Sequence, residues 1–546
     1  MSTPRQDLGE ALWRLSDVVR ADERSRSFRA KAYRRAVWSL DDLAPDLSDP
    51  AERALSIPGI GAGVLRLIEE FREGGQLDLL ERLEMAYPRD VSRMRRLPRM
   101  TPTILRSLKG ELGVDTSADL IAAIEAGGVE ALRGVGAATA ERWGRTLQLA
   151  PSDQAIPGYQ ATVLADALTR HFSRHLGAKV QVAGAVRRID EWVESVDLVA
   201  GTDEVEAGGM FLEDTAVARH IGHRPKGETV LQTHEGVRTR VHLVRPSEVG
   251  GRLLLETGPD WHAGELLADM DGNGLTEAEI YEQNGRIWVP PAARALEPEM
   301  AEVVVRTAQI RGDLHVHSEL SPDGRMSLFE ILAESVEREY EYVLITDHTT
   351  GLRFGGLDGA GLQLQSTLIE EARARFPDLL VLQGAELNIE RDGSLDIDDE
   401  ALSRLDLAVA GLHSHFDLER SEQTTRVLRA LSHPSVQVLA HPTGRRIGNR
   451  PAIDVDFDAV IAAAVENKVA LEVNGHRDRL DLSAEHAALA VAGGAYLAAN
   501  SDAHRLDEMG NIANAVATMQ RAGVAPSSVV NTMPVREFRE WAGVTD

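Results

Sequence analysis

The second half of the chain repeats one pattern, in which a short apolar run of β-type residues is followed by a helical stretch. Strands that alternate with helices form parallel βα units. Seven consecutive units predict a closed (β/α)7 barrel. The runs are Asp313–His317, Tyr342–His348, Leu379–Glu386, Leu405–His413, Val436–His441, Val469–Asn474 and Ala495–His504.

Two tetrapeptides in this half fit the capping box, in which a hydroxyl residue and a Glu three positions later satisfy each other's backbone N–H groups. They are Ser327 to Glu330 and Thr367 to Glu370. We expect a helix to begin at each of them.

Metal-binding side chains occur at the ends of six of the seven runs, and Asn474 ends the other. The carboxyl ends of barrel strands meet on one face, so these residues should lie together although they are distant in sequence. His315 and His317 are two residues apart on one strand and should point the same way. The nine candidate ligands are His315, His317, Asp323, His348, Glu386, His413, His441, Asp502 and His504.

The chain contains no cysteine, so a metal ion must be held by imidazoles and carboxylates. A lone histidine at a strand end is usually structural, but burying nine such groups without a metal would leave many polar atoms unsatisfied. Nine ligands exceed the needs of one ion, which predicts two or three ions bridged by Glu386 or Asp502. Manganese, zinc and iron all suit these ligands. Water bound between such ions ionises near neutral pH and attacks phosphorus.

Other residues beside the predicted cluster suggest supporting roles. Arg445 follows His441 closely and is a candidate clamp for a substrate phosphate. Asp347 is a candidate catalytic group that orients ligands, as Asn474 would. His415 and His476 are expected near the cluster without binding metal, although their roles stay open.

The first 150 residues are helical in pattern, with short glycine and proline breaks. Two breaks, at residues 57–63 and 132–138, resemble each other and each precedes a helical run. A Gly-x-Gly turn before a helix brings a phosphate close to unpaired N–H groups. This helix-hairpin-helix pattern predicts DNA binding, and two simple interhelical turns are the alternative. The glycines concerned are Gly59, Gly61, Gly63, Gly134 and Gly136.

The charge distribution permits such a role for this region. The whole chain has a net charge of −27, but residues 1–150 carry 23 Lys and Arg against 23 Asp and Glu. No apolar stretch is long enough to span a bilayer and no leader pattern precedes the first helix. We expect a cytoplasmic protein that does not bind membranes.

The second half carries a set of motifs that resembles the polymerase and histidinol phosphatase (PHP) domain family. They are His315-x-His317, Thr346-Asp347-His348, Gly384-Ala385-Glu386, His441-Pro442 and Ser501-Asp502-Ala503-His504. The whole chain is similar to bacterial family X DNA polymerases. The resemblance implies a multidomain fold with a helical helix-hairpin-helix region, an α/β nucleotidyltransferase-like polymerase core and a distorted (β/α)7 PHP barrel.

The same resemblance implies four domains. They are a helical DNA-binding, lyase-like domain at 1–85, a fingers-like region with the second hairpin at 86–150, a degenerate palm and thumb-like region at 151–300, and a PHP phosphoesterase at 301–546. It further implies a DNA repair enzyme acting as a manganese-dependent 3′–5′ exonuclease, or as an apurinic-site endonuclease or 3′-phosphatase. Its partner would be gapped, nicked or primer–template DNA, and a monomer is expected.

The polymerase core departs from the family pattern of Gly-Ser, two arginines, Asp-x-Asp and a later third Asp. Arg187, Arg188 and Asp197 match, but Ser195 stands at the first aspartate position and Arg240 at the third. One carboxylate cannot hold two magnesium ions, because each ion needs carboxylate charge to offset its dehydration. We expect nucleotidyl transfer to be weak or absent.

The N-terminal domain lacks the lysines that its animal relatives use for lyase chemistry, since Gly63 and Leu67 stand in their places. Arg29, Tyr33 and Arg34 match positions that could hold a DNA 5′-phosphate. Three alternatives remain: an active gap-filling polymerase that uses a residue such as Glu194, a small-molecule phosphatase of the histidinol-phosphatase type, and a DNA-end tether without enzymatic activity.

Overall fold

The computed structural model describes residues 2–22, 27–152, 154–224, 227–270, 272–352 and 355–544. The chain forms two compact units. The N-terminal unit comprises residues 1–187, 192–257 and 263–283, and the barrel unit comprises 188–191, 258–262 and 284–546. Residues 284–300, which the sequence assigns to the thumb-like region, thus belong to the barrel unit. No helix among the described residues is long and apolar enough to cross a membrane.

The N-terminal unit begins with short helices that form two hydrophobic cores. Met94, Leu108 and Trp143 belong to one core, formed by the later helices. Leu12 belongs to the other, which also includes strand residues from farther along the chain. The helices are α1 (Pro4–Asp22), α2 (Phe28–Ser39), α3 (Ala51–Leu55), α4 (Ala62–Gly74), α5 (Asp78–Glu84), α6 (Val91–Met94), α7 (Pro102–Leu112), α8 (Ser117–Glu125) and α9 (Ala137–Leu147), with 3₁₀ turns η1 (Leu40–Asp42) and η2 (Val129–Ala131).

A five-stranded sheet follows, with strand order β2-β4-β7-β6-β5. It lies in the region that the sequence analysis expects to be a palm and is called the palm sheet below. Strands β4 and β7 are parallel and the other neighbours are antiparallel. Leu168 and Leu198 share their core with Leu12 of α1, so the first helices and the palm are one folding unit. The elements are α10 (Gly158–Leu176), β2 (Val180–Ala183), α11 (Gly184–Arg187), β4 (Ser195–Gly201), α12 (Val205–Asp214), β5 (Ala218–Arg224), β6 (Glu228–Thr233) and β7 (Arg238–Val244).

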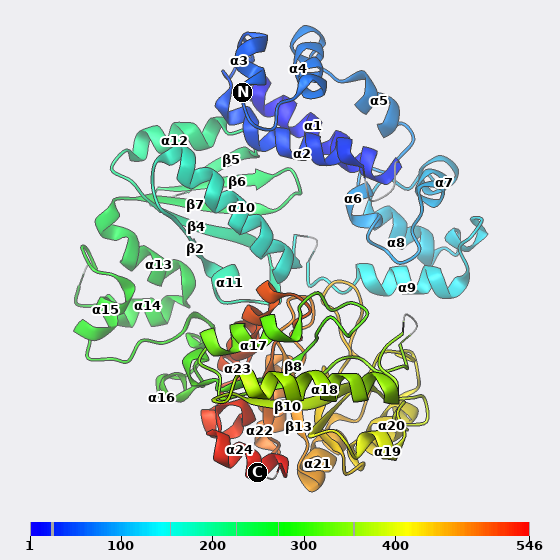
Figure 1. Ribbon diagram of the computed structural model, residues 1–546. Coiled ribbons are helices and arrows are strands. Elements are labelled where there is room, and N and C mark those ends of the chain that lie inside the picture. Colours follow the sequence, from blue (N-terminus) through cyan, green and yellow to red (C-terminus); the bar gives the residue numbers. More distant parts are fainter. Residues whose placement is uncertain are drawn as a thin grey trace. The chain divides into compact units, whose positions relative to one another are not determined.

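Smaller elements complete the N-terminal unit and lead into the barrel. A two-stranded pairing joins β1 (Ile156–Pro157) and β3 (Trp192–Val193). The remaining segments are η3 (Pro246–Glu248), α13 (Val249–Thr257), α14 (Asp260–Leu266), α15 (Glu277–Gln283), η4 (Pro291–Ala293), α16 (Pro298–Val303) and η5 (Thr307–Gln309). Of these, η4 and η5 pack against α23 (Ile512–Arg521), which explains why they belong to the barrel unit. Figure 1 shows α13 and α15 near each other at one side of the five-stranded sheet.

The barrel unit contains seven parallel strands in sequence order, which confirms the predicted (β/α)7 architecture. The barrel is nearly closed: the segment after β14 pairs with β8 through the bridge between Ala503 and Val316, and the Leu314 N–H donates to Asn500 Oδ1. The strands are β8 (Gly312–Val316), β9 (Tyr342–Ile345), β10 (Leu380–Asn388), β11 (Leu407–Gly411), β12 (Val436–Ala440), β13 (Ala470–Asn474) and β14 (Leu497–Asn500).

Side chains along each strand alternate between the barrel interior and the surrounding helices. On β13, Leu471 and Val473 pack in the core beneath the helices, whereas Ala470 joins an interior core with Phe538. Phe538 lies on α24 (Val535–Ala542) and stacks on Tyr342 at 4.0 Å between ring centroids. Apolar residues thus fill the amino-terminal end of the barrel, and the carboxyl end is left to the polar site.

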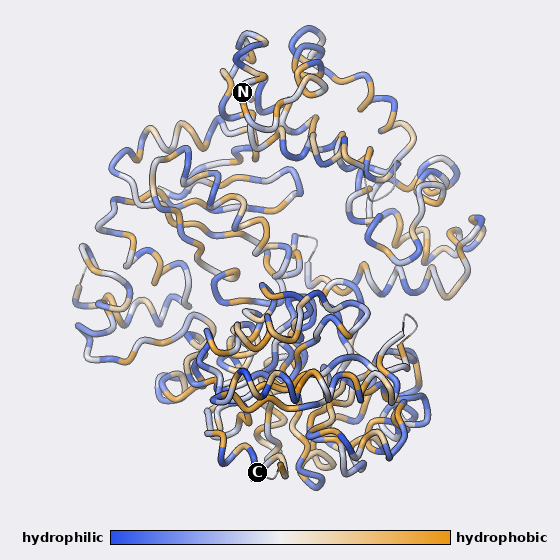
Figure 2. The backbone as a smooth tube through the Cα atoms, viewed as in Figure 1, coloured by the Kyte–Doolittle hydropathy of each residue, from blue (hydrophilic) through white to orange (hydrophobic). Residues whose placement is uncertain are grey.

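Helices surround these strands, and Figure 2 shows long hydrophobic stretches in the strands with mixed hydropathy in the helices. Ser327 and Glu330 form the predicted capping box. The second predicted box is wrong: Thr367 lies inside α18, which begins after an Asp358 cap. The helices are α17 (Leu328–Glu337), α18 (Gly359–Arg375), α19 (Asp399–Leu402), α20 (Arg420–Leu431), α21 (Phe457–Asn467), α22 (Ala484–Ala492), α23 and α24, with η6 (Leu506–Asn511), η7 (Pro526–Ser528) and η8 (Val530–Thr532).

Candidate metal centre

The structure brings all nine candidate ligands together at the carboxyl ends of the barrel strands. His315 and Glu386 lie on strands, and the others lie on the loops that follow strand ends. All are buried or half-buried, although Asp323 at the rim retains 41% exposure of its side chain. The fold therefore gathers residues that are up to 189 positions apart, from His315 to His504.

Glu386 lies at the centre of the cluster, with one carboxylate close to five imidazoles. Its Oε1 is 2.8 Å from His441 Nε2 and 2.9 Å from His413 Nε2. Its Oε2 is 3.0 Å from His348 Nδ1, 3.2 Å from His315 Nε2 and 3.5 Å from His317 Nε2. A carboxylate with both oxygens surrounded in this way has the arrangement of a bridge between cations.

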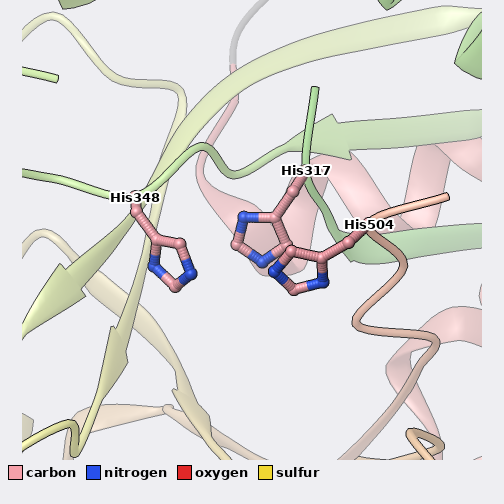
Figure 3. Close-up of side chains that lie close together, drawn as sticks. All are labelled: His317, His348 and His504. Atoms are coloured by element: carbon pink, nitrogen blue, oxygen red, sulfur yellow. The ribbon is translucent and has the colours of Figure 1, made fainter. Parts of the chain in front are cut away.

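Three overlapping groups of ligand atoms within 4.8 Å of one another make up most of the cluster: His315, His317 and Asp502; His317, His348 and His504; and His348, Glu386 and His413. Figure 3 shows the second group, with three rings from separate segments drawn together. The ring centroids of His317 lie 4.1 Å from His504 and 4.4 Å from His348. Each group offers three ligand atoms close enough together to hold one ion.

Asp502 and Asp323 supply the remaining carboxylates. Asp502 Oδ1 is 3.4 Å from His317 Nε2 and 3.6 Å from His315 Nε2. Asp323 Oδ2 is 3.4 Å from His504 Nε2 and 3.8 Å from His348 Nε2. Asp502 adopts a φ of +54°, an unusual conformation that turns its side chain into the cluster.

The imidazoles are oriented by hydrogen bonds on their outer nitrogens. His315 Nδ1 lies 2.7 Å from Glu472, His317 Nδ1 lies 3.2 Å from Ser321 Oγ, and His504 Nδ1 lies 3.0 Å from the Asp502 carbonyl. His413 Nδ1 is 3.3 Å from Asn388 Oδ1. Each of these rings thereby presents its Nε2 to the cluster, an arrangement typical of metal-bound histidine.

The inner atoms of the cluster fit a metal site. His315 Nε2, His317 Nε2, His348 Nδ1 and Glu386 Oε2 are buried and have no hydrogen-bond partner. Leaving several such atoms unsatisfied is costly, at about 1–3 kcal/mol for each. Cations bound between them would remove this cost, so the residues present fit divalent ions.

The ionisation behaviour of the cluster follows from burial and close charges. Burial and the neighbouring His504 and His348 hold the pKa of His317 well below its ordinary value. Burial would raise the pKa of Glu386, but the surrounding imidazoles, led by His413 and His348, hold it well below its ordinary value. Glu386 is therefore a carboxylate and His317 a neutral imidazole, the forms that bind metal.

Glu472 is a candidate orienting residue that sequence reasoning missed. It is fully buried, and besides His315 Nδ1 it accepts bonds from the His441 N–H at 2.6 Å and the Asn500 amide at 2.9 Å. Asn474 donates to both Glu472 and Asp502 at 3.0 Å, as an orienting group would. A lone carboxylate inside the apolar run Val469–Asn474 was the available signal.

Asp347 is buried but bonds away from the cluster, to the backbone N–H and hydroxyl of Ser318 and to Gln365. Its side chain positions the loop after β8 and, among the described residues, makes no hydrogen bond to any of the nine candidate ligands, although its carbonyl accepts one from the Glu386 N–H at 3.2 Å. The structure therefore favours a positioning role over a catalytic one. His415 is exposed, and His476 is paired with Asp478 at 2.6 Å.

Arg445 is occupied elsewhere, contrary to its expected role as a phosphate clamp. Its guanidinium pairs with Glu191 at 2.6 and 3.0 Å and also donates to the carbonyls of Arg479 and Leu480. Arg479 lies closer to the ligands: its Nε is 3.3 Å from Asp502 Oδ2. Its side chain is only 9% exposed, and Nε and Nη1 have no hydrogen-bond partner.

The residual polymerase site has a different construction. Asp197 on β4 is directly opposite Arg240 on β7, and Arg240 Nε lies 2.5 Å from Asp197 Oδ1. Ser195 donates to the same oxygen at 3.2 Å. Arg187 pairs with Glu277 at 2.6 Å, and Arg188 pairs with Asp190 at 2.6 Å. The carboxylate is already neutralised by a guanidinium where the resemblance expects magnesium.

The two predicted hairpin turns share one backbone geometry. The first glycine of each has a positive φ, +101° at Gly59 and +91° at Gly134. Gly61 and Gly136 are extended and precede α4 and α9 directly. A Cβ at Gly61, Gly63 or Gly136 would meet nothing within 4 Å, so internal packing does not require these glycines. They leave the helix N-termini accessible from outside.

The three residues expected to hold a 5′-phosphate are less favourably placed. Tyr33 is buried in the core. Arg34 stacks on the Trp13 ring at 3.6 Å and pairs with Asp17 and with Glu235, the latter at 3.1 Å. These contacts use Arg34 for packing within the N-terminal unit, and the role of Arg29 stays a prediction.

Comparison with known proteins relates both parts of the chain to characterised families. The helix-hairpin-helix domain family matches residues 3–77. The DNA polymerase/3′-5′ exonuclease PolX of Bacillus subtilis is 28% identical, over 94% of this chain and 95% of its own length. A probable phosphatase of Syntrophotalea carbinolica is 30% identical over 241 residues, which are 41% of this chain and 93% of that protein.

Among solved structures, a histidinol phosphate phosphatase of Lactococcus lactis, complexed with zinc, L-histidinol and phosphate, covers 39% of this chain with 17% identity and a TM-score of 0.32. The sequence relatives are sufficient to assign the barrel unit as a metal-dependent phosphoesterase. The carboxyl-terminal part of the chain belongs to the family of PHP-type phosphatases, and the chain as a whole is a homologue of PolX that carries a helix-hairpin-helix domain.

Proposed function

We propose that this protein removes nucleotides from the 3′ ends of DNA with its barrel unit, and that its palm transfers nucleotides weakly or not at all. The observation that carries the proposal is the position of Glu386 between five imidazoles, with unsatisfied inner nitrogens facing it. The similarity to a relative named as a polymerase and 3′-5′ exonuclease supports DNA as the substrate.

The nine predicted residues are the proposed ligands. Three groups of ligand atoms favour two or three divalent ions, with Glu386 bridging and Asp502 contributing to a second group. Imidazole with carboxylate and no thiolate suits manganese, zinc or iron. Such ions lower the pKa of bound water and neutralise the oxygens of a phosphate that undergoes attack.

The chain's own groups would orient and bind the substrate. Glu472 fixes the ring of His315 and the backbone at His441, so that both present a ring nitrogen inward. Arg479 replaces Arg445 as the proposed phosphate-binding cation, because it lies 3.3 Å from Asp502 with free donors. A guanidinium at this place can donate two parallel hydrogen bonds to a phosphate.

The palm is proposed to act as a scaffold for DNA rather than as a polymerase. Arg240 places its cation on Asp197, and Gly184 brings its backbone so close that a Cβ there would lie 2.0 Å from Asp197 Oδ2. Magnesium would have to displace the guanidinium and would then find one aspartate where the family provides three. The ion cannot recover its hydration energy from so few carboxylates.

The two hairpin turns are the proposed DNA contacts. Helix N-termini that follow open glycines, at Gly61 and Gly136, can bind backbone phosphates without regard to base sequence. A gapped, nicked or primer–template end would meet this requirement. As the sequence predicts, we place the activity in the cytoplasm and in a monomer.

A primer assay tests the proposal. Full-length protein with manganese is mixed with a 5′-labelled primer annealed to a template, and we expect the primer to shorten one nucleotide at a time. Glu386→Gln should lower the rate on the order of 10³-fold, because metal polarisation contributes several kcal/mol. His433→Gln, a half-buried histidine paired with the exposed Asp399, is the matched control.

Deoxynucleotides added to the same reaction test the alternative that the protein is an active polymerase. We expect no lengthening of the primer by either variant or by the unchanged protein. Lengthening that survives Glu386→Gln would contradict the proposed palm, and shortening that is indifferent to Glu386→Gln would contradict the proposed nuclease. Primers that end in a 3′-phosphate or carry an apurinic site test the related activities.

A small-molecule phosphatase is the second candidate, because several relatives that match only the barrel region are named as probable phosphatases. An assay that compares histidinol phosphate with the primer as substrates distinguishes the small-molecule phosphatase from the nuclease. Release of phosphate from histidinol phosphate at a higher kcat/KM than the shortening of the primer would favour the small molecule.

A further inference from the structure

A second cluster of metal-binding side chains lies in the N-terminal unit, at the outer edge of the palm sheet. Glu213 is in the last turn of α12, and His220 and His223 are on β5. One ligand atom from each residue lies within 4.8 Å of the others. None of the three belongs to the barrel cluster or to the residual polymerase site.

A β-bulge explains how two histidines three positions apart come to share one face. On a regular strand, His220 and His223 would point to opposite sides. Here His220 pairs with Leu231, Gly222 with Val230 and His223 with Thr229, so the register shifts between the first two pairs. The extra residue of the bulge turns both histidines to the same face of the sheet, and their ring centroids lie 4.5 Å apart.

The ligand atoms of this cluster are ready to accept a cation. His220 Nε2 is buried and has no hydrogen-bond partner. His223 Nε2 lies 2.7 Å from Glu213 Oε1, and both of these side chains are half exposed. His220 Nε2 is shielded from water and gains no hydrogen bond in exchange. A bound ion would provide the missing partner. The exposed pair leaves a path from solvent.

We propose that Glu213, His220 and His223 bind one zinc ion. Two imidazoles and one carboxylate are an established zinc ligand set that leaves a fourth, open position for water. Ligand atoms around tetrahedral zinc are roughly 3.4 Å apart, given bonds of about 2.1 Å. Small rotations of exposed side chains bring the present atoms to that spacing.

The position of the site indicates what the ion does. The carbonyl of Glu213 accepts a bond from Gln6 Nε2 at 2.7 Å, and the next residue, Asp214, pairs with Arg5 at 2.5 Å. The turn that supplies Glu213 therefore also holds α1. Zinc would cross-link this turn to the edge strand β5 and so stabilise the contact between the palm and the first helix.

Zinc content measured by elemental analysis tests the site. Full-length protein without a histidine tag is equilibrated with zinc, freed of excess and compared with His220→Gln, His223→Gln and Glu213→Gln. We expect each variant to hold one zinc per chain fewer than the unchanged protein. His433→Gln, which changes a half-buried imidazole beside a single carboxylate, should hold the full number.

Thermal unfolding provides a second readout that does not depend on nuclease activity. Zinc should raise the unfolding midpoint of the N-terminal unit in the unchanged protein and raise it less in His223→Gln, while primer shortening stays unchanged. Equal zinc content in all four proteins, or an equal rise of the midpoint in His223→Gln, would overturn the proposal. Because His223 is half exposed, the substitution does not endanger folding.

Discussion

The barrel and the palm of this chain each bury a carboxylate beside basic groups, and they do so in opposite ways. Glu386 faces five imidazoles, and the inner nitrogens of three of them, His315, His317 and His348, have no hydrogen-bond partner. Asp197 faces the guanidinium of Arg240 at 2.5 Å. An imidazole can give its lone pair to a metal, whereas a guanidinium has no acceptor and is itself the cation. The barrel cluster can therefore bind metal ions, whereas in the palm the guanidinium of Arg240 already neutralises the carboxylate of Asp197.

The largest effect that we expect is a loss of stability when the guanidinium of Arg240 is removed from the palm. Asp197 is 2% exposed, so Arg240→Ala removes the guanidinium from a buried carboxylate and leaves it the hydroxyl of Ser195 as a hydrogen-bond donor. We expect a loss on the order of 3 kcal/mol in the free energy of unfolding of the N-terminal unit. Urea unfolding measures it, with Arg238→Ala on the same strand as control. Equal effects of the two substitutions would show that the pair contributes nothing.

Metal ions should produce the opposite result in the barrel. Manganese at about 100 times its dissociation constant should stabilise the barrel by about 2.7 kcal/mol, since it binds only the folded cluster. That corresponds to a rise of about 5–10 °C in the unfolding midpoint, which calorimetry with and without chelator detects. A midpoint that chelation leaves unchanged would mean that the cluster holds no ion.

Substitution of Glu472 tests whether the orientation of the metal ligands matters in the barrel. Glu472→Gln keeps the shape of the side chain but weakens its bond to His315 Nδ1. We expect a loss of about 10–100-fold in manganese affinity or nuclease rate, as for other groups that orient metal ligands. Gln365→Ala, which removes a partner of Asp347, should have a smaller effect. If both variants retain the full rate, the roles assigned to Glu472 and Asp347 are wrong.

The smallest expected effect concerns the hairpin turns. Gly61→Leu and Gly136→Leu add side chains where a Cβ meets open space, so folding should be unaffected and DNA should be held off. We expect about tenfold weaker binding of primer–template at low salt, the loss of one or two phosphate contacts. Fluorescence anisotropy measures it, with Gly110→Leu, on the exposed part of α7, as the matched control. Unchanged affinity in both hairpin variants would place the DNA elsewhere.

Sequence reasoning predicted the barrel and its nine candidate ligands because both follow from one local rule. Each strand is a short apolar run, and the first polar residue after it must lie at the carboxyl end. The rule missed Glu472, because the apolar run that contains this carboxylate ends at Asn474. It also misplaced a helix start at Thr367, since Asp358 caps α18 earlier.

The sequence pattern could not predict which side chains are already engaged by residues that are distant in sequence. Arg445 and Arg479 both follow strands with site residues, but Glu191, 254 positions away, holds Arg445 and leaves Arg479 beside Asp502. Tyr33 and Arg34 matched a phosphate pocket in sequence, yet one is buried and the other stacks on Trp13. The pairing of His220 with His223 required a bulge, which shifts the face of a strand without a signature in the residues themselves.

Anomalous diffraction from crystals soaked in manganese tests the central claim most directly, because it locates each ion. The account predicts peaks in the barrel within bonding distance of Glu386, His317 and Asp502, and no peak beside Asp197. A peak at Asp197, or an empty cluster around Glu386, would contradict it.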